Sequence, residues 1–580
     1  MASSQVNENV RYEPEERPPV LVTVGVGFQF ILLTITTMAV VTVVIVRTSE
    51  QPESYLTWSF FADLAVAGVC TVVQAVRIRR LGAGYLLIMG PSPVFISVCI
   101  TALAEGGPAL MSSLIVVSSL VQFIVASRLS ALRRVITPVV SGCVFMLIAA
   151  VVMPSLFELM QDVPAGTSPL AGPATAAVTI AIVIGLALRA PQNWQQWSPL
   201  LAILAGWAVA STFGLSTFQT VADAGWVGVP SIGSWPGFDL GFGVSFWTLL
   251  TSFIVVTLVS SIIAIGNGVT IQQVSHRTPR ATDFRVVQGA LNGEGLGNLL
   301  YGLAGTVGNT VYPSSISGVS LMGVAARSVG ICAGLILLGT ALLPKALALL
   351  LAIPSPVAAT YMVALFSLIF MQGVRTVSQE GLDARKALVV GLSLWIGAAF
   401  HFEWLFADQL TGAWGALLSN GLTSGGLSVI LLNAITEVAF SRRRRLDTEL
   451  SISALARINV FLSEIASKAG WNETSTQRLC SAGEETLSSL LSRDSEGSSS
   501  TGQRLIVNAH LIDGAVEMEF LTAPEGTENL EDRMSFLGEQ SEVPDESDVP
   551  LRLLRHYATS VQHRVYHNID IITVRVEGHS

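Results

Sequence analysis

Two short interruptions in apolar segments decide the fold: residues 89–93 (MGPSP) and residues 308–318 (GNTVYPSSISG). Proline and glycine break helices, so each interruption leaves free backbone N–H groups and the positive end of a helix dipole inside the membrane. Such breaks at matching places in two halves of a chain are typical of inverted-repeat transporters, which bind solute there. A proline kink satisfied by neighbouring helices is the alternative reading of each break.

Apolar runs surround both interruptions and fill most of residues 19–440. They are about 18 to 25 residues long, which suits a helix crossing a hydrocarbon core of about 30 Å. Of the 580 residues only 13% are charged and 51% are hydrophobic, and the mean hydropathy is +0.60, which excludes a soluble globular protein of this size. Because strands of alternating polarity are absent, the sequence predicts an all-α polytopic membrane protein and not a β-barrel.

We predict about fourteen spans in a seven-plus-seven inverted repeat, with the third and the tenth span broken. The first seven lie near residues 22–46, 58–76, 85–103, 109–126, 135–153, 174–188 and 199–213. The second seven lie near residues 246–267, 291–307, 314–325, 329–352, 357–371, 388–400 and 414–439. Residues 1–18 are expected to be a disordered cytoplasmic tail, and residues 19–440 the transporter domain.

Basic residues predict the orientation, because short cytoplasmic loops retain Lys and Arg. They follow the even-numbered spans, as at Arg77, Arg189 and Arg327, whereas the other loops are poor in them. Both termini of a multi-pass protein of the cell membrane are therefore expected in the cytoplasm. The net charge of −9 argues against nucleic acid as a partner. The five cysteines lack paired spacing, and neither a metal site nor a cofactor is expected.

Several segments resemble the nucleobase–ascorbate transporter family, also called uracil/xanthine permeases or nucleobase:cation symporters. They are residues 17–21 (RPPVL) with 27–30 (GFQF), residues 137–142 (TPVVSG), and residues 309–312 (NTVY) continuing to 323–327 (GVAAR). The resemblance implies a secondary-active transporter whose substrates are nucleobases such as uracil or xanthine. Phe30 stands where the family usually has a histidine.

The family signature of the tenth span is matched only at Gly323. Its other positions hold Ser314, Ser315, Ser317 and Met322. The acid that the family carries in its eighth span would fall at Ile263, so the two carboxylates that hold nucleobases in the family are missing from these places. The coupling ion is therefore left open, because a hydroxyl cannot carry a proton near neutral pH.

Three acids remain in the membrane part: Asp63, Glu105 and Glu294. Glu105 stands beside Gly106, Gly107 and Pro108 and is expected in a loop. Asp63 and Glu294 are expected near span ends, where a solvated, interfacial role is more usual than a proton relay.

The predicted binding site lies where the two broken spans meet. Its residues are Val94, Phe95, Asn267, Asn309, Ser314, Ser315 and Ser317. A neutral pocket rich in donors also suits an anion, so a transporter of the sulfate-permease type is the first alternative, and a receptor-like membrane sensor is the second. An enzyme is not expected, because catalytic motifs are absent. The expected partners are a small-molecule substrate and the lipid bilayer, and a homodimer and a cytoplasmic protein bound to the tail are compatible with the sequence.

The tail, residues 446–580, is predicted to be a cytoplasmic α+β regulatory or interaction domain. Residues 455–491 have apolar positions at helical spacing, residues 505–520 form a hairpin turning at Asp513 and Gly514, and residues 569–576 form another strand. The stretch 482–489 (AGEETLSS) resembles the N-box helix of histidine-kinase-like ATPases of the anti-sigma-factor type. Ser488 or Ser489 stands where that box needs an asparagine for Mg²⁺, which implies a degenerate module that binds nucleotide weakly or not at all.

Overall fold

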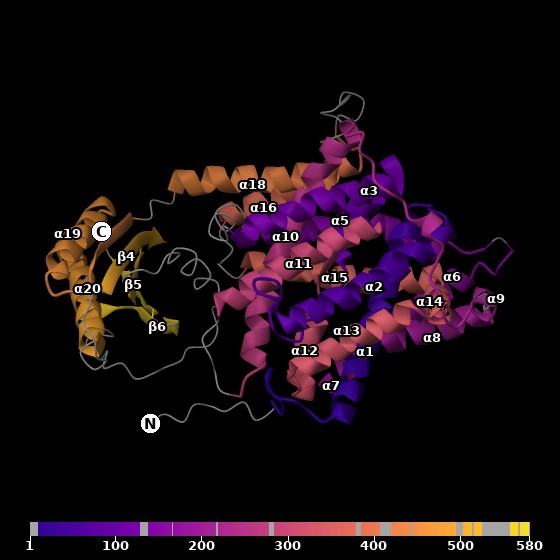
Figure 1. Cartoon of the computed structure of the whole chain (residues 1–580). Coiled ribbons are helices and arrows are strands. Elements are labelled where there is room, and N and C mark those ends of the chain that lie inside the picture. The colour runs from indigo at the N-terminus through magenta and orange to yellow at the C-terminus, as the bar shows by residue number, and fades with distance from the viewer. Residues whose placement is uncertain are drawn as a thin grey trace. The chain divides into compact units, whose positions relative to one another are not determined.

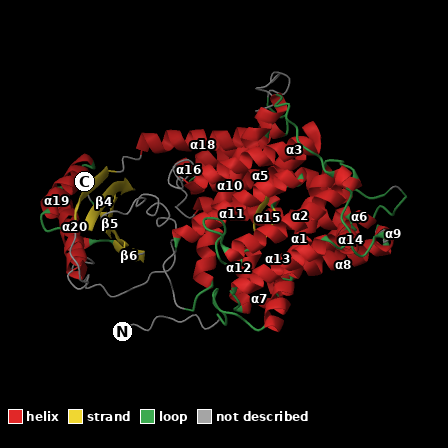
Figure 2. Cartoon of the chain, viewed as in Figure 1, coloured by secondary structure: helices red, strands yellow, loops and turns green. Residues whose placement is uncertain are grey.

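The computed structural model describes residues 10–127, 137–164, 166–195, 197–215, 219–277, 283–378, 384–405, 418, 420–440, 444–494, 503–512, 515–524, 557–566 and 569–578. The chain forms two compact units, one ending at Asn433 and the other beginning at Ala434. Figure 1 labels their helices and strands, and Figure 2 shows that strands are concentrated in the C-terminal unit.

The first half of the membrane unit contains long apolar helices and one short strand. In chain order it comprises α1 (Val20–Thr48), α2 (Glu53–Val76), β1 (Met89–Pro91), η1 (Pro93–Phe95), α3 (Ile96–Ser127), α5 (Pro138–Gln161), α6 (Ala171–Arg189), α7 (Gln192–Gln195), α8 (Ser198–Thr212), α9 (Gln219–Asp223) and η2 (Ile232–Ser234). The predicted third and fourth spans join in α3, which is kinked at Gly107 (φ 70°, ψ −172°). Glu105 lies in α3 just before this kink, so its placement in a loop is wrong.

The second half repeats the pattern of long helices with one short strand. It comprises α10 (Val244–Val274), α11 (Phe284–Ala304), β2 (Asn309–Val311), α12 (Pro313–Met322), α13 (Arg327–Ala341), α14 (Pro344–Leu351), α15 (Ser355–Ser378), α16 (Ala384–His401) and α18 (Gly421–Phe440). Among the described residues seven helices are long and apolar enough to cross a membrane, or eight if α13 and α14, bent by 88°, form one span. The other predicted spans fall on helices that are shorter or less apolar, or on the broken segments, and parts of the fifth and the fourteenth lie outside the described residues.

The third and tenth spans are broken and pair with each other, as predicted. Strands β1 and β2 form an antiparallel ladder in which Met89 faces Val311 and Pro91 faces Asn309. The ladder extends by one bond beyond β1, because the Ser92 N–H donates to Gly308 O at 2.8 Å. In each half a three-residue strand leads into a helical segment that opens with proline, as expected of a transporter built from two repeats.

A second pair of equivalent spans crosses at close range. Helices α5 and α15 correspond to the fifth span of each half, and they meet at Gly142 and Gly373. A Cβ on either glycine would lie 2.6 Å from the carbonyl oxygen of the other. This reciprocal contact is what a two-fold relation between the halves produces, and only glycine permits so close an approach.

The described part of the N-terminal segment is ordered, which departs from the expected disordered tail. The Arg11 and Tyr12 N–H groups donate to Gly323 O at 2.7 and 3.1 Å. Arg277, just after α10, binds both carboxylate oxygens of Glu16 at 2.7 Å. This hydrogen-bonded guanidinium holds the pKa of Glu16 below its usual range. Polar composition suggested disorder, but tertiary partners supply the contacts that order residues 10–17.

The C-terminal unit is a five-stranded antiparallel sheet packed against two helices. Its elements are β3 (Arg444–Glu449), α19 (Ala454–Lys468), α20 (Glu473–Asp494), β4 (Gln503–Ile512), β5 (Ala515–Pro524), β6 (Ser560–Tyr566) and β7 (Ile569–Glu577), with strand order β3-β4-β5-β7-β6. The predicted hairpin and final strand are confirmed as β4, β5 and β7, although Asp513 and Gly514 lie outside the described residues. Alternate residues of these strands, such as Leu505 and Val507, share a core with both helices.

The helical spacing found over residues 455–491 corresponds to two helices, α19 and α20. Gly470 adopts a left-handed conformation (φ 73°) after α19, and Asn472 then caps α20 by accepting the Ser475 N–H at 2.8 Å. Glu484 of α20 is exposed.

Candidate functional site

Four of the seven predicted site residues lie together beside the β1–β2 ladder. Val94 and Phe95 follow β1 directly in η1, and both are buried. Asn309 begins β2 and has no exposed surface. Asn267 reaches the ladder from α10, where its Nδ2 donates to Val311 O at 3.1 Å. The ladder therefore brings groups from the third, eighth and tenth spans to one place.

The three predicted serines lie in α12 and differ in their surroundings. Ser315 is buried, and its hydroxyl donates to Tyr312 O at 2.6 Å. Ser314 and Ser317 are exposed, and the Ser317 hydroxyl lies 3.5 Å from Pro313 O. The Ser315 hydroxyl thus donates within its own segment. Fewer hydrogen-bond donors of α12 are therefore left for a solute than the sequence predicted.

The sequence predicted a solvated Glu294 near the end of a span, at the membrane–water interface. In the structure, Glu294 lies in α11 and is part of the same site. It has no exposed surface. Its Oε1 accepts hydrogen bonds from Ser260 Oγ of α10 and, at 3.2 Å, from Gln122 Nε2 of α3. Ser260 Oγ also lies 3.4 Å from Thr310 Oγ1 of β2. The expected solvated role of Glu294 is wrong, because α3, α10 and β2 pack around it.

Asn298 joins this network to the second strand. It lies one helical turn after Glu294, where its Nδ2 donates to Gln122 Oε1 at 2.8 Å. Its Oδ1 accepts the Asn309 backbone N–H at 2.7 Å. Gly297 leaves space for the Asn309 side chain, since a Cβ at position 297 would lie 2.3 Å from Asn309 Nδ2.

Three residues at this site carry buried polar atoms that have no hydrogen-bond partner in the described chain. They are Glu294 at Oε2, Ser92 at Oγ and Asn309 at both Nδ2 and Oδ1. An unpaired buried polar group costs about 1–3 kcal/mol, and more when it is charged, so such groups are rare without a use. The carboxylate oxygen can accept a hydrogen bond, while the amide can donate one and accept another. Donors and acceptors of this kind match a solute that presents N–H and C=O groups.

A second buried acid, Asp63 of α2, lies in a separate set of contacts. Its Oδ2 accepts from Thr42 Oγ1 of α1, and its Oδ1 accepts from Thr306 Oγ1, between α11 and β2. Asp63 has no exposed surface, so the solvated role expected for it is also wrong. The partners found for both buried acids are neutral hydroxyl or amide groups.

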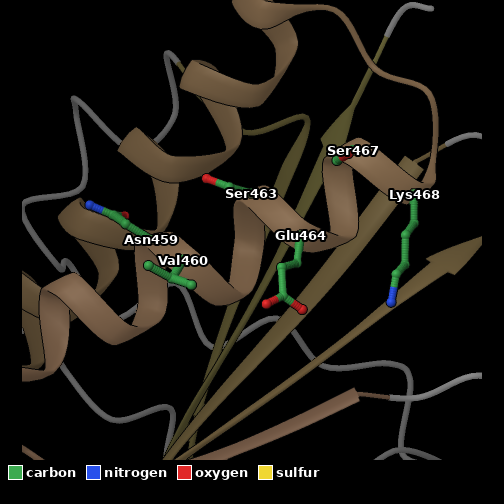
Figure 3. Close-up of a pocket in the computed structure, with 6 residues that line it drawn as sticks. All are labelled: Asn459, Val460, Ser463, Glu464, Ser467 and Lys468. Atoms are coloured by element: carbon green, nitrogen blue, oxygen red, sulfur yellow. The ribbon is translucent and has the colours of Figure 1, made fainter.

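The hollow shown in Figure 3 belongs to the C-terminal unit and lies along one face of α19. Its lining consists of Asn459, Val460, Ser463, Glu464, Ser467 and Lys468. Glu464 is paired with Arg444, whose Nη1 lies 2.9 Å from its Oε2. With a single helix supplying the lining, this hollow has no opposing wall that would enclose a small solute.

Comparisons with known proteins agree with the resemblance read from the sequence. Xanthine permease XanP of Escherichia coli is 27% identical over 448 residues, covering 74% of this chain and 95% of the relative. A xanthine permease of Bacillus subtilis is 24% identical over 442 residues, covering 74% of this chain and 97% of the relative.

A solved structure also aligns with this chain. The transmembrane domain of the cyanobacterial bicarbonate transporter BicA is 16% identical, with a TM-score of 0.44, and covers 74% of this chain and all of that domain. The model of the Permease family for xanthine and uracil permeases matches residues 22–403, and the chain therefore belongs to this family of membrane transporters.

Proposed function

We propose that the chain is a secondary-active transporter of nucleobases or similar flat heterocycles. The observation that carries the proposal is the pair of buried, unpaired groups at the β1–β2 ladder, the Glu294 carboxylate oxygen and the Asn309 amide. Xanthine and uracil present N–H donors and C=O acceptors in one plane, so an acidic oxygen and an amide match an edge of either base. The names of the xanthine permeases support the same substrate class.

The site favours a base over an anion. The anion alternative depended on a pocket without acids, whereas Glu294 lies buried within the network. A carboxylate in a water-poor site repels an inorganic anion strongly, because charges interact more strongly there than in water. The same carboxylate strengthens a hydrogen bond from a neutral N–H donor.

Orientation and location belong to the same proposal. The basic loops after even-numbered spans support a cell-membrane protein whose two termini are cytoplasmic. Residues 19–440 would then carry transport, and residues 446–580 would form a regulatory or interaction domain inside the cell. A homodimer and a protein partner of the tail fit this arrangement.

Uptake measurements test the substrate class directly. The full chain is expressed in a bacterial strain that lacks its own base permeases, and uptake of labelled xanthine, uracil and sulfate is compared with that of an empty vector. We expect uptake of at least one base, competed by unlabelled base and not by sulfate. Sulfate uptake without base uptake would refute the proposal and support the anion alternative.

A further inference from the structure

We propose that Asp63 is the residue that carries the coupling proton, at a site separate from the solute-binding Glu294 and Asn309. The proposal rests on the proposed function only in that the protein moves a solute through its membrane unit. A carboxylate inside a membrane protein is costly unless it has a role, and ion or proton pathways are the usual one. Asp63 is fully buried, and its partners are hydroxyls.

The two hydroxyls beside Asp63 can satisfy it in either protonation state. Thr42 Oγ1 donates to the carboxylate or to Met38 O, which lies 3.2 Å away. Thr306 Oγ1 donates to the carboxylate or to Ser59 O at 3.1 Å. When Asp63 is ionised, both hydroxyls can point to it. When a proton binds to Asp63, one threonine hydroxyl turns to donate to its backbone carbonyl. The oxygen of that hydroxyl then accepts a hydrogen bond from the new O–H group of the acid.

Glu294 is not built in this way. Its Oε1 is held partly by the Gln122 amide, whose N–H group donates and cannot accept, and its Oε2 has no partner in the described chain. Protonation at Oε2 would leave the new O–H without an acceptor in the described chain, whereas a solute N–H would satisfy that oxygen. The two acids therefore suit different ligands: a proton at Asp63 and a solute at Glu294.

The proton site is linked to the solute site by a short stretch of chain. Thr306, which bonds Asp63, stands three residues before Asn309. Tyr301 of α11 donates to Asp63 O at 3.1 Å, and Glu294 and Asn298 lie along the same helix at positions that share its face. A change in the Thr306 hydrogen bond can therefore be transmitted to the segment that carries the solute-binding amide.

In the described chain, the other titratable groups that face Asp63 are phenols and a thiol, which are ordinarily uncharged near physiological pH. They are the phenols of Tyr55, Tyr301 and Tyr312 and the thiol of Cys99. None of them supplies a counter-charge to the carboxylate. The step itself is simple: one carboxylate oxygen gains a proton from water on one side of the membrane and returns it to water on the other side.

The test uses the full chain, purified and reconstituted into liposomes. Asp63→Asn keeps the shape of the side chain and removes its titration. We expect solute exchange at equal pH to stay within about threefold of wild type, while accumulation driven by a pH gradient falls at least tenfold. Undiminished accumulation would overturn the proposal, as would a wild-type accumulation that follows a sodium gradient and ignores the pH gradient. A folded variant that loses exchange as well would assign Asp63 to solute binding and also overturn it.

Infrared titration of the same samples needs no solute and separates this proposal from the proposed function. We expect a buried carboxylic-acid band in the wild type that is missing from Asp63→Asn, and an unchanged band would refute the assignment. Absence of base uptake by the wild type would refute the substrate class alone.

A second variant keeps the carboxylate, in case Asp63→Asn fails to fold. Thr42→Val removes one hydrogen-bond donor to the ionised Asp63. The midpoint of the Asp63 infrared titration should therefore move upward by about one pH unit. The matched control is Thr360→Val, because the buried Thr360 hydroxyl donates only to Pro356 O of its own helix, at 2.6 Å. An unmoved midpoint in Thr42→Val would count against the proposal.

Discussion

Replacing Glu294 by glutamine should weaken solute binding strongly while leaving the surrounding network in place. The amide oxygen of Glu294→Gln can still accept from Ser260 Oγ and Gln122 Nε2, the present partners of Oε1. The NH₂ group replaces Oε2, which has no partner in the described chain. An acceptor oxygen thus becomes a donor at the point where we place the solute N–H.

The expected loss follows from the hydrogen bond that disappears. Leaving a buried N–H donor without its acceptor costs about 1–3 kcal/mol, which corresponds to roughly a 5- to 150-fold loss of apparent affinity. The new NH₂ group also faces the solute N–H, and two donors facing each other lower the apparent affinity further. The KM for base uptake should rise accordingly, and the amount of protein in the membrane should not change.

Glu105→Gln is the matched control, because Glu105 is another acid of the membrane unit and is exposed at the kink of α3. Its uptake kinetics should stay within about twofold of wild type. The assay is initial-rate uptake of labelled base over a range of concentrations, with surface protein quantified in parallel. A wild-type KM for Glu294→Gln would refute the assignment of Glu294 to the site.

Three further predictions concern the site and the tail. Gly297→Ala should reduce base uptake more than tenfold, because its Cβ would lie 2.3 Å from Asn309 Nδ2 and overpacking costs about 1–3 kcal/mol. The control is Gly266→Ala, which should transport normally because the space around its new Cβ is open. Equal uptake by the two variants would contradict this reasoning. Ser317→Leu should abolish uptake at normal expression while Ile263→Ala is mild, and full uptake by Ser317→Leu would exclude α12 from the pocket. The tail, prepared from Arg444 so that β3 is intact, should show no micromolar binding of Mg-ATP in calorimetry, and a clear binding isotherm would refute the degenerate reading.

The helical membrane class and the two breaks could be predicted from local sequence. Long apolar runs and the Pro/Gly/Ser interruptions act over a few residues, so MGPSP at 89–93 and GNTVYPSSISG at 308–318 led directly to β1 and β2. The hairpin of the tail was visible for the same reason, because strand alternation and a turn are local signals. Val94, Phe95 and Asn309 were predicted as site residues because they lie in or next to these segments, and in the structure Asn267 contacts the same ladder.

Glu294 and Asp63 were misjudged because burial depends on neighbours that are distant in the chain. A useful signal was present in α11, where Glu294, Asn298 and Tyr301 follow helical spacing and form one polar face. Periodicity identifies such a face, but it cannot say whether lipid, water or another helix covers it. Both acids are removed from water only by tertiary packing. Glu294 is covered by α3, α10 and β2, and Asp63 is covered by α1 and Thr306. Local sequence sets where helices break, whereas the contacts between helices set which polar groups are buried and what they can bind.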